Sequence, residues 1–248
     1  MKAPEMKAAM SAKTPMVGVS IMFSSPQLVE MIAALGFDWV LIDCEHGSID
    51  LSNLEMMAIA AKAAGITAIA RPPSNSPIDI MRVMDRGVDG VQVPHIKSQK
   101  EAKAAVESVK FHPLGNRGLA MGTRPSNYGI GVELDQYSKT SNLDSIVVLQ
   151  IEDREAIENL DEILSVADVD VFFVGPSDLS QSLGHPGKAN KPPVSTAITK
   201  IFRSIAEAGL TSGTASSEKQ MEKAKKEGCC YLYTHLNNVL KLGAENYL

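Results

Sequence analysis

Short apolar runs rich in β-branched residues alternate with longer amphipathic segments along the whole chain. The runs are typical of strands buried on both faces, and the amphipathic segments are typical of helices that cover them. This pattern predicts strands over residues 17–22, 39–43, 66–71, 90–94, 145–151, 169–175, 210–214 and 230–234. It predicts helices over residues 26–34, 51–64, 77–86, 98–110, 154–166, 194–208 and 218–227, a short turn of helix from 178 and a last helix from 237.

Eight strand–helix units within 248 residues match the number and size of a (β/α)8 barrel. A doubly wound open sheet is the alternative, but the first strand lacks a G-x-G-x-x-G turn and no G-x-x-x-x-G-K-[ST] segment occurs anywhere. Nothing in the pattern marks a domain boundary. The sequence therefore predicts a single α/β domain over residues 1–248, a TIM barrel preceded by a short N-terminal helix.

One segment interrupts the alternation. Residues 111–131, FHPLGNRGLAMGTRPSNYGIG, are rich in Gly, Pro, Asn and Arg. Long segments of this composition inside a compact domain are often functional loops, and we predict one here.

Composition narrows the possible functions and the compartment. The net charge is −5 with lysines and acids interspersed, which argues against nucleic-acid and membrane-surface partners. No apolar run approaches the ~20 residues of a membrane helix, and the first residues do not resemble a secretory signal. Three cysteines give no even disulfide framework, so we expect a cytoplasmic protein.

Polar and charged residues follow the predicted strands at their carboxyl ends, which meet at one mouth in a barrel. The second strand ends at Asp43, Glu45 and His46, and the third ends at Arg71. The remaining residues of this set are His95, Gln150, Glu152, the segment Gly175-Pro176-Ser177-Asp178, and His235. Each acid has an alternative role as a helix N-cap, and His46 alone is more typical of a surface histidine. Their recurrence on several strands favours one shared site.

Glu152 and Asp178 follow neighbouring strands and predict an oxygen-rich pair. Two carboxylates suit a hard or borderline divalent ion such as Mg²⁺ or Mn²⁺, with waters or substrate completing the shell. Co²⁺ and Zn²⁺ are further candidates, and no motif for an organic cofactor is present.

Several of these segments resemble the HpcH/HpaI aldolases, which are metal-dependent (class II) pyruvate aldolases. The segments are FDWVLIDCEHGSID at 37–50, IARP at 69–72, VQVP at 91–94, VVLQIEDREAIENL at 147–160 and VFFVGPSDLSQSLG at 171–184. The likeness runs from about Val17 to Leu240. It implies a barrel of the phosphoenolpyruvate/pyruvate type and an aldehyde-lyase similar to the 2,4-dihydroxyhept-2-ene-1,7-dioate and 2-dehydro-3-deoxyglucarate aldolases.

The resemblance also implies roles for single residues. Glu152 and Asp178 would ligate the metal, and Asp43 would hydrogen-bond to a metal-bound water without touching the ion itself. His46 would act as the base, oriented by Asp85, and Arg71 would face the developing enolate oxygen. The substrate would lie beside Gln150, with its carboxylate held by backbone N–H groups around Gly175, Pro176 and Ser177.

The reaction implied is the reversible cleavage of a 4-hydroxy-2-oxo acid to pyruvate, or a related 2-oxo acid, and an aldehyde. The family likeness further implies a homo-oligomer, a hexamer built as a trimer of dimers, with the C-terminal helix packed on a neighbouring subunit. His235 and Asn237 depart from the family, which more usually has glycine and aspartate there.

Other functions stay open on the sequence. A Schiff-base aldolase would need a lysine at a strand end, and only Lys97 comes near. A lyase of the same superfamily acting on CoA thioesters is a second alternative. A barrel that binds a 2-oxo acid without turnover is a third.

Overall fold

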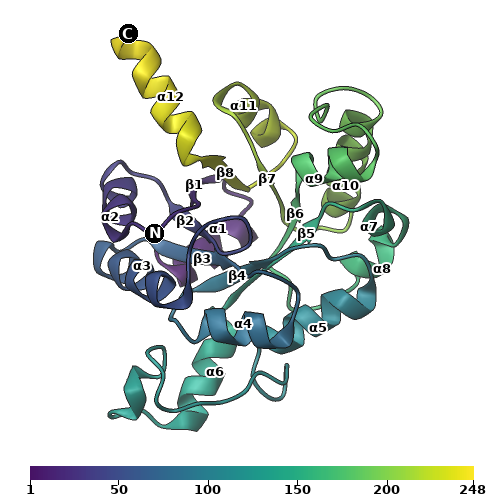
Figure 1. Cartoon of the computed structure of the whole chain (residues 1–248). Helices are drawn as coiled ribbons and strands as arrows, with labels where there is room; N and C mark the ends of the chain where they lie inside the picture. The colour runs from purple at the N-terminus through teal and green to yellow at the C-terminus, as the bar shows by residue number, and fades with distance from the viewer.

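The structure is a computed structural model that describes residues 1–248. Eight parallel strands pair in chain order and close into a barrel, which confirms the predicted (β/α)8 fold (Figure 1). The strands are β1 (Met16–Ile21), β2 (Trp39–Asp43), β3 (Thr67–Arg71), β4 (Gly90–Val93), β5 (Ile146–Ile151), β6 (Val171–Val174), β7 (Ser212–Ala215) and β8 (Tyr231–His235).

Most of the helices form the outer layer of the barrel. In chain order, the helices are α1 (Ala3–Ser11), α2 (Pro26–Ala34), α3 (Leu51–Ala64), α4 (Pro77–Met84), α5 (Gln99–Val109), α6 (Leu134–Asp144), α7 (Arg154–Glu158), α8 (Leu160–Leu164), α9 (Pro176–Ser182), α10 (Val194–Glu207), α11 (Glu218–Lys226) and α12 (Leu236–Tyr247), with a 3-10 turn at Asn127–Gly129. None of these helices has the length and apolar character that a membrane span requires.

Local sequence explains where the helices begin. Ser25, Asp50 and Ser98 each accept a hydrogen bond from a backbone N–H in the first turn of α2, α3 and α5. Such caps satisfy donors that have no partner inside the helix. At the other end of α3, Gly65 has φ 71°, a left-handed conformation that glycine adopts without a steric penalty.

Two predictions of elements were wrong. The helix predicted over 154–166 is divided at Asn159 into α7 and α8. Helix α6 lies in a stretch for which no element was predicted. Its eleven residues include no buried side chain, so the apolar period that reveals a packed helix is absent from its sequence.

Three aspartates tie the strands together at their amino ends. Asp38, Asp89 and Asp170 each directly precede an even-numbered strand, β2, β4 or β6. Each accepts a 2.8 Å hydrogen bond from a backbone N–H of the preceding strand, donated by Val17, Ala68 and Val147 respectively. The repeated sequence position therefore corresponds to a repeated contact between neighbouring strands.

The barrel interior changes character along its axis. Its amino-terminal part is an apolar cluster in which Trp39 stacks on Tyr231 with ring centroids 4.1 Å apart. Met6 and Met10 of α1 join this cluster and close that end of the barrel. Gly18 is required beside Trp39, because a Cβ there would lie 2.5 Å from the indole ring. The carboxyl-terminal part carries buried polar residues instead.

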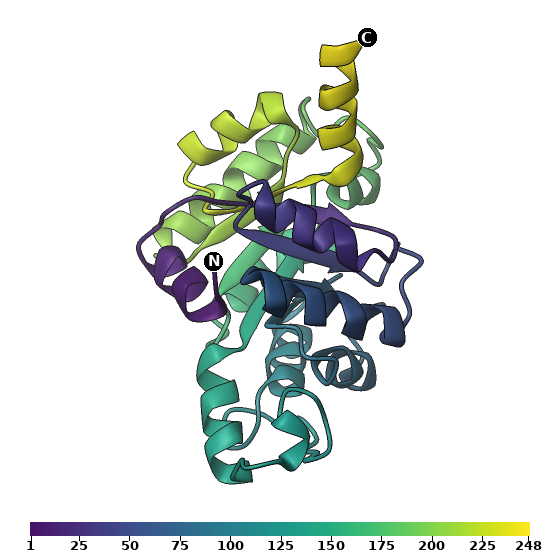
Figure 2. The ribbon, with the colours of Figure 1, turned by 90° about the vertical axis from the view of Figure 1, so that its left-hand side faces the viewer.

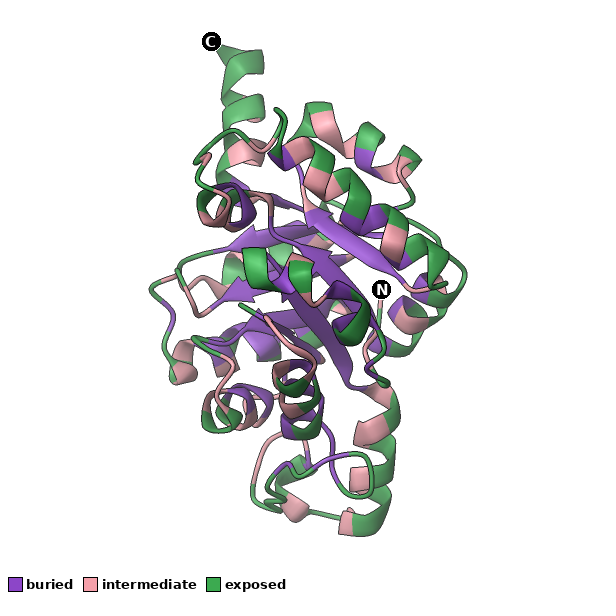
Figure 3. Ribbon diagram, turned by 90° about the vertical axis from the view of Figure 1, so that its right-hand side faces the viewer, coloured by how far each residue is buried: buried purple, intermediate pink, exposed green.

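A second and larger apolar cluster lies between the strands and the helices and is formed by strand residues together with buried helix residues. Figure 3 shows the buried strands inside helices whose outer faces are exposed. Two segments extend away from the barrel. Helix α12 projects at one end, and the segment that includes α6 projects at the other (Figures 1 and 2).

Candidate active site

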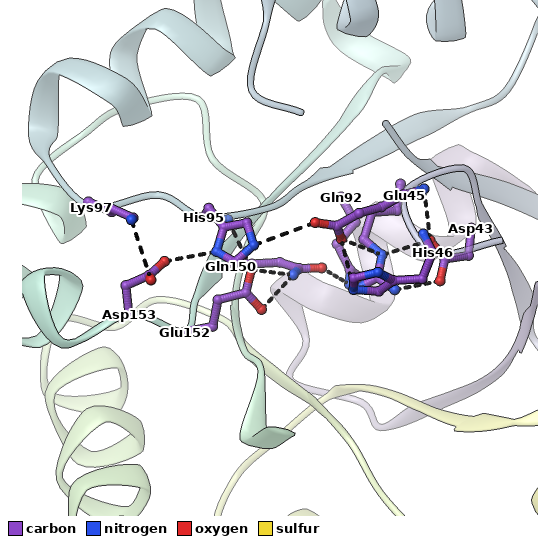
Figure 4. Close-up of polar contacts among 10 residues, drawn as sticks. Asp43, Glu45, His46, Gln92, His95, Lys97, Gln150, Glu152 and Asp153 are labelled. Carbon is purple, nitrogen blue, oxygen red and sulfur yellow. Dashed lines mark hydrogen bonds and ion pairs between the residues drawn. The ribbon is translucent and has the colours of Figure 1, made fainter. Parts of the chain in front are cut away.

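The carboxyl-terminal end of the barrel contains a cavity of about 180 Å³. Because side chains alternate between the two faces of a strand, every second residue of each strand points into the barrel and the last of these reach its mouth. The residues that line the cavity are Met22, His46, Arg71, Gln150, Glu152, Phe173, Gly175, Pro176, Ser177, Asp178, Ala215, Tyr233 and His235. Figure 4 shows the polar side chains that converge at this end.

Arg71 and Asp43 form a buried ion pair on neighbouring strands. The strand register pairs them directly, and Arg71 donates from Nε to Asp43 Oδ1 at 2.9 Å and from Nη2 to Asp43 Oδ2. Burial would raise the pKa of the Asp43 carboxyl, but the hydrogen bonds and charge of Arg71 outweigh it, so that pKa lies below its ordinary value. Arg71 lines the cavity, and none of its hydrogen bonds or ion pairs within the chain involves Nη1.

The loop after β2 is folded by the same aspartate. Asp43 Oδ1 accepts from the backbone N–H groups of Glu45 (3.1 Å) and His46 (3.2 Å). Glu45 Oε2 then lies 3.1 Å from Arg71 Nε and 3.7 Å from His46 Nε2. Burial raises the pKa of Glu45, although the charge of Arg71 opposes the shift. Asp43 thus positions both Arg71 and the His46 loop.

A chain of buried amides fixes the orientation of Gln150. Tyr231 Oη donates to Gln92 Oε1 at 3.1 Å, and Gln92 Nε2 donates to Gln150 Oε1. Gln150 Nε2 consequently faces Glu152 and donates to both of its carboxylate oxygens at 2.7 Å. The amide therefore orients Glu152 from inside the barrel.

Glu152 is 1% exposed and has a densely packed environment. Besides Gln150, it accepts a hydrogen bond from the backbone N–H of His95 at 2.9 Å. A Cβ at position 175 would lie 2.3 Å from Glu152 Oε2, so only glycine fits there. Burial raises the pKa of Glu152 to about 7, hydrogen bonds from His95 and Gln150 oppose the rise, and the nearby charge of Asp178 adds to it.

These observations fit a divalent cation. A buried carboxylate beside a second one is electrostatically unfavourable unless a positive charge lies between them. No group of three or more His, Cys, Asp or Glu side chains converges in a geometry that holds a metal. Glu152 and Asp178 would therefore supply only two protein ligands, leaving the remaining positions to water or substrate, as is common for Mg²⁺.

Asp178 and Ser177 lie in the first turn of α9, after Gly175 and with Pro176 at the first helical position. The first N–H groups of a helix have no partner within it. Proline at the first helical position therefore removes no hydrogen bond from the helix. The first turn of α9 therefore presents free backbone donors beside Glu152.

The structure brings most of the predicted site residues together. His46, Arg71, Gln150, Glu152 and the segment 175–178 line one cavity. Asp43 does not line it and instead contacts Arg71 from the neighbouring strand β2.

Asp85 does not contact His46 within the chain. It follows the last turn of α4, and its Oδ1 accepts a 2.7 Å hydrogen bond from Arg117 Nη2. Helices of a (β/α)8 barrel run opposite to the strands, so a residue at the carboxyl end of a helix lies at the amino-terminal side of the barrel. His46 is at the other side, and the expected orienting contact is therefore not formed inside one chain.

Sequence reasoning gave no role to His95, Gln92 or Asp153. His95 Nδ1 lies 2.9 Å from Asp153 Oδ2. Burial would lower the pKa of His95, but the hydrogen bond to Asp153 and the surrounding carboxylates raise it overall. The position of His95 just after a strand was visible in the sequence, whereas its left-handed backbone was not.

His235 forms part of the cavity wall and packs edge-on against Tyr233 with ring centroids 5.5 Å apart. Burial and then the charge of Arg71 lower its pKa, which favours the neutral imidazole. It also borders a second cavity of about 530 Å³ between α10, α11 and the start of α12. His235, which differs from the residue usual in the family, therefore lies where two cavities meet.

Comparison with known proteins identifies relatives over most of the chain. Residues 17–231 match the HpcH/HpaI aldolase/citrate lyase family. The chain is 32% identical over 221 residues, 89% of this chain and 86% of the relative, to the hydroxypyruvate/pyruvate aldolase of Sagittula stellata. It is 35% identical over 207 residues, 84% of this chain and 79% of the relative, to the 5-keto-4-deoxy-D-glucarate aldolase of Shigella boydii.

Solved structures agree with the sequence matches. The crystal structure of an HpcH/HpaI aldolase/citrate lyase family protein from Burkholderia cenocepacia superimposes with a TM-score of 0.91 at 26% identity. The match covers 98% of this chain and 96% of that one. The fold, the polar mouth of the barrel and these relatives lead to one conclusion: the chain belongs to the HpcH/HpaI aldolase/citrate lyase family and is a lyase of the aldolase type.

Proposed function

We propose that this aldolase depends on a divalent metal and reversibly cleaves a 4-hydroxy-2-oxo acid to pyruvate, or a related 2-oxo acid, and an aldehyde. The observation that carries the proposal is that Glu152, Asp178, Arg71 and His46 line one small cavity. The relatives named as pyruvate and keto-deoxy-sugar acid aldolases support the same substrate class.

Glu152 and Asp178 are the residues that would hold the metal. When bound there, the ion would polarise the 2-oxo group of the substrate and so make its neighbouring methyl group more acidic. Mg²⁺ and Mn²⁺ match the oxygen ligands best. We therefore propose Mg²⁺ or Mn²⁺ as the bound ion.

Arg71 would stabilise the negative charge that develops on the enolate oxygen. Its Nε and Nη2 are occupied by Asp43 and Glu45, which leaves Nη1 for the substrate. A guanidinium held on one side by two carboxylates has little freedom to reorient, and preorganised donors of this kind contribute most to catalysis.

His46 would remove the methyl proton in the direction of carbon–carbon bond formation and return it in cleavage. Its Nε2 lies beside Glu45, the nearest carboxylate in the same chain. The free N–H groups at the start of α9 would bind the substrate carboxylate, opposite Arg71. A role for Asp85 at His46 would require a second copy of the chain, in accord with the homo-oligomer that we propose from the family resemblance.

The test is deuterium exchange at the methyl group of pyruvate, followed by NMR, with and without divalent metal. We expect exchange that EDTA abolishes and that Mn²⁺ or Mg²⁺ restores. Exchange that continues in EDTA would contradict the metal dependence. Borohydride should fail to trap pyruvate on the protein, since no lysine lines the cavity and Lys97 lies 3.5 Å from Asp153.

The two other functions make different predictions in the same assay. A binding protein without turnover would bind oxalate or pyruvate and show no exchange. A lyase acting on CoA thioesters would cleave a hydroxyacyl-CoA and leave 4-hydroxy-2-oxo acids intact. Aldol cleavage of a 4-hydroxy-2-oxo acid, measured by coupling pyruvate release to lactate dehydrogenase, separates the proposal from both.

A further inference from the structure

His95 occupies an unusual backbone position at the carboxyl end of β4. Its φ is 55°, a left-handed conformation that costs a non-glycine residue about 1 kcal/mol or more. Two hydrogen bonds to the end of β5 and the residue that follows it accompany this turn: His95 N–H donates to Glu152 Oε1 at 2.9 Å, and Ile96 N–H donates to the Gln150 carbonyl at 3.2 Å. The turn therefore directs a backbone donor at the buried carboxylate.

The His95 ring lies between two carboxylates, one beside each ring nitrogen. Nδ1 lies 2.9 Å from Asp153 Oδ2, and Nε2 lies 3.5 Å from Glu45 Oε1. An ionised carboxylate only accepts hydrogen bonds, so Nδ1 carries the proton in the shorter pair. Lys97 Nζ lies 3.5 Å from the other Asp153 oxygen and extends this row of polar side chains, which Figure 4 shows.

Glu45 connects this row to the residues that act on the substrate. One carboxylate oxygen faces His95, while the other lies 3.1 Å from Arg71 Nε and 3.7 Å from His46 Nε2. The side chains of Glu45 and Arg71 are 11% and 7% exposed, so solvent screens their contact only weakly, whereas the His95 and His46 rings are 47% and 52% exposed. A change in the position of His95 would therefore be transmitted to Arg71 and His46.

Strands β2 and β5 are not neighbours, because β3 and β4 lie between them in the barrel. The His95 ring nevertheless links the end of β2, through Glu45, to the end of β5, through Asp153. We propose that His95 is a positioning residue that holds the His46 loop in register with the Glu152 carboxylate across the mouth of the barrel. This inference rests on the proposed function.

The alternative is that His95 merely stabilises the fold. Its side chain is 47% exposed, so its removal leaves solvent rather than a cavity in the core. Surface changes of this kind usually alter stability by less than about 0.5 kcal/mol. A positioning role and a structural role therefore differ in what they predict.

The experiment compares His95→Gly with the matched control Asp168→Gly in the full-length, metal-loaded protein. Both residues have a positive φ, 55° and 60°, and glycine tolerates that backbone. Asp168 is exposed and lies in the loop before β6. That loop is at the amino end of the strands, opposite the mouth. His95→Gly keeps the N–H that reaches Glu152 and removes only the ring.

We expect His95→Gly to lower kcat for exchange of the pyruvate methyl proton on the order of tenfold, the range typical of residues that orient ligands. The KM for pyruvate and the Tm should stay close to those of the wild type. Asp168→Gly should leave all three unchanged. Equal kcat for His95→Gly and Asp168→Gly would overturn the proposal.

A double-mutant cycle tests whether the effect runs through Glu45. The kcat of His95→Gly/Glu45→Gln should fall no further than that of the more impaired single variant, because groups acting through one contact are non-additive. Losses that multiply would show that His95 acts independently of Glu45 and would contradict the inference.

A second readout does not depend on turnover. Long-range ¹H–¹⁵N NMR spectra of the histidine rings should show altered His46 signals in His95→Gly and unaltered ones in Asp168→Gly. If the wild-type protein fails to exchange pyruvate, the proposed function is wrong. The His46 signals still decide the positioning role, since unchanged signals in His95→Gly would refute it.

Discussion

Arg71 lines the cavity, and its surroundings determine its orientation. Asp43 contacts it from the neighbouring strand β2 and Glu45 from the loop that follows β2, and the arginine itself is 6% exposed. A lysine ammonium could keep the charge but could not form the paired contacts to Asp43 while also facing the cavity. At the scale of single residues, the site is thus built from pairs in which one partner fixes the other.

Replacement of Arg71 by Lys should lower kcat for pyruvate methyl exchange on the order of a hundredfold, comparable to the loss of an oxyanion donor. Stopped-flow or NMR exchange rates at saturating pyruvate provide the measurement. Arg203→Lys, on the exposed face of α10, is the control and should retain the wild-type rate. A rate for Arg71→Lys within a factor of two of the wild type would contradict the proposed role.

Asp43 should couple stability to pH. Its pKa in the folded protein lies below the ordinary value, so its ion pair stabilises the folded state above that ordinary value and is lost as the pH falls through the folded pKa. Asp43→Asn leaves Arg71 buried without its main partner and should cost about 3 kcal/mol or more at pH 7. Urea unfolding of both proteins should show a difference that is full at pH 7 and shrinks below pH ~4.

At the scale of elements, only some of the positions of the site residues could be predicted from the sequence. The strand ends could be predicted, because apolar runs that stop at Asp43, Arg71 and Glu152 are distinct. The His95 turn could not, because a left-handed backbone depends on contacts from β5. The position of Asp85 could not be predicted either. Helix α4 runs opposite to the strands, so its carboxyl end and Asp85 lie at the other side of the barrel from His46.

The approach of the β6–α9 turn to Glu152 leaves no space for a side chain at position 175. Gly175→Ala would place a Cβ 2.3 Å from Glu152 Oε2 and displace the carboxylate. We expect the Mn²⁺ concentration for half-maximal activation to rise on the order of tenfold or more. Gly243→Ala on α12, where a Cβ has no atom within 4 Å, should leave that concentration unchanged.

The three aspartates before β2, β4 and β6 lie at the amino end of the barrel, away from the cavity, and we expect them to affect stability and not the reaction. Asp38→Ala removes a hydrogen bond to Val17 and leaves that N–H without a partner in a half-buried position. The expected loss is about 2 kcal/mol in the free energy of unfolding, as for a hydrogen bond to a charged group. The KM for pyruvate should not change, because the site lies at the opposite end.

At the scale of the whole molecule, helix α12 carries large apolar side chains that the chain itself leaves exposed. Helix α12 buries only Leu236, while Leu240 is 62% and Tyr247 92% exposed. The homo-oligomer that we propose would cover these side chains. Leu240→Glu should then reduce the mass measured by light scattering, and Lys241→Gln, one residue further, should not; a wild-type monomer at micromolar concentration would contradict the proposal.

The division of the barrel interior into an apolar base and a polar mouth has a practical consequence for redesign. Trp39, Tyr231 and Met6 form the base, so libraries at those positions would mostly yield unfolded protein. Ala215 and His235 lie on the rim, where each is only partly buried and borders both cavities. Combinatorial substitution at these two positions would search for new aldehyde acceptors and leave the apolar base unchanged.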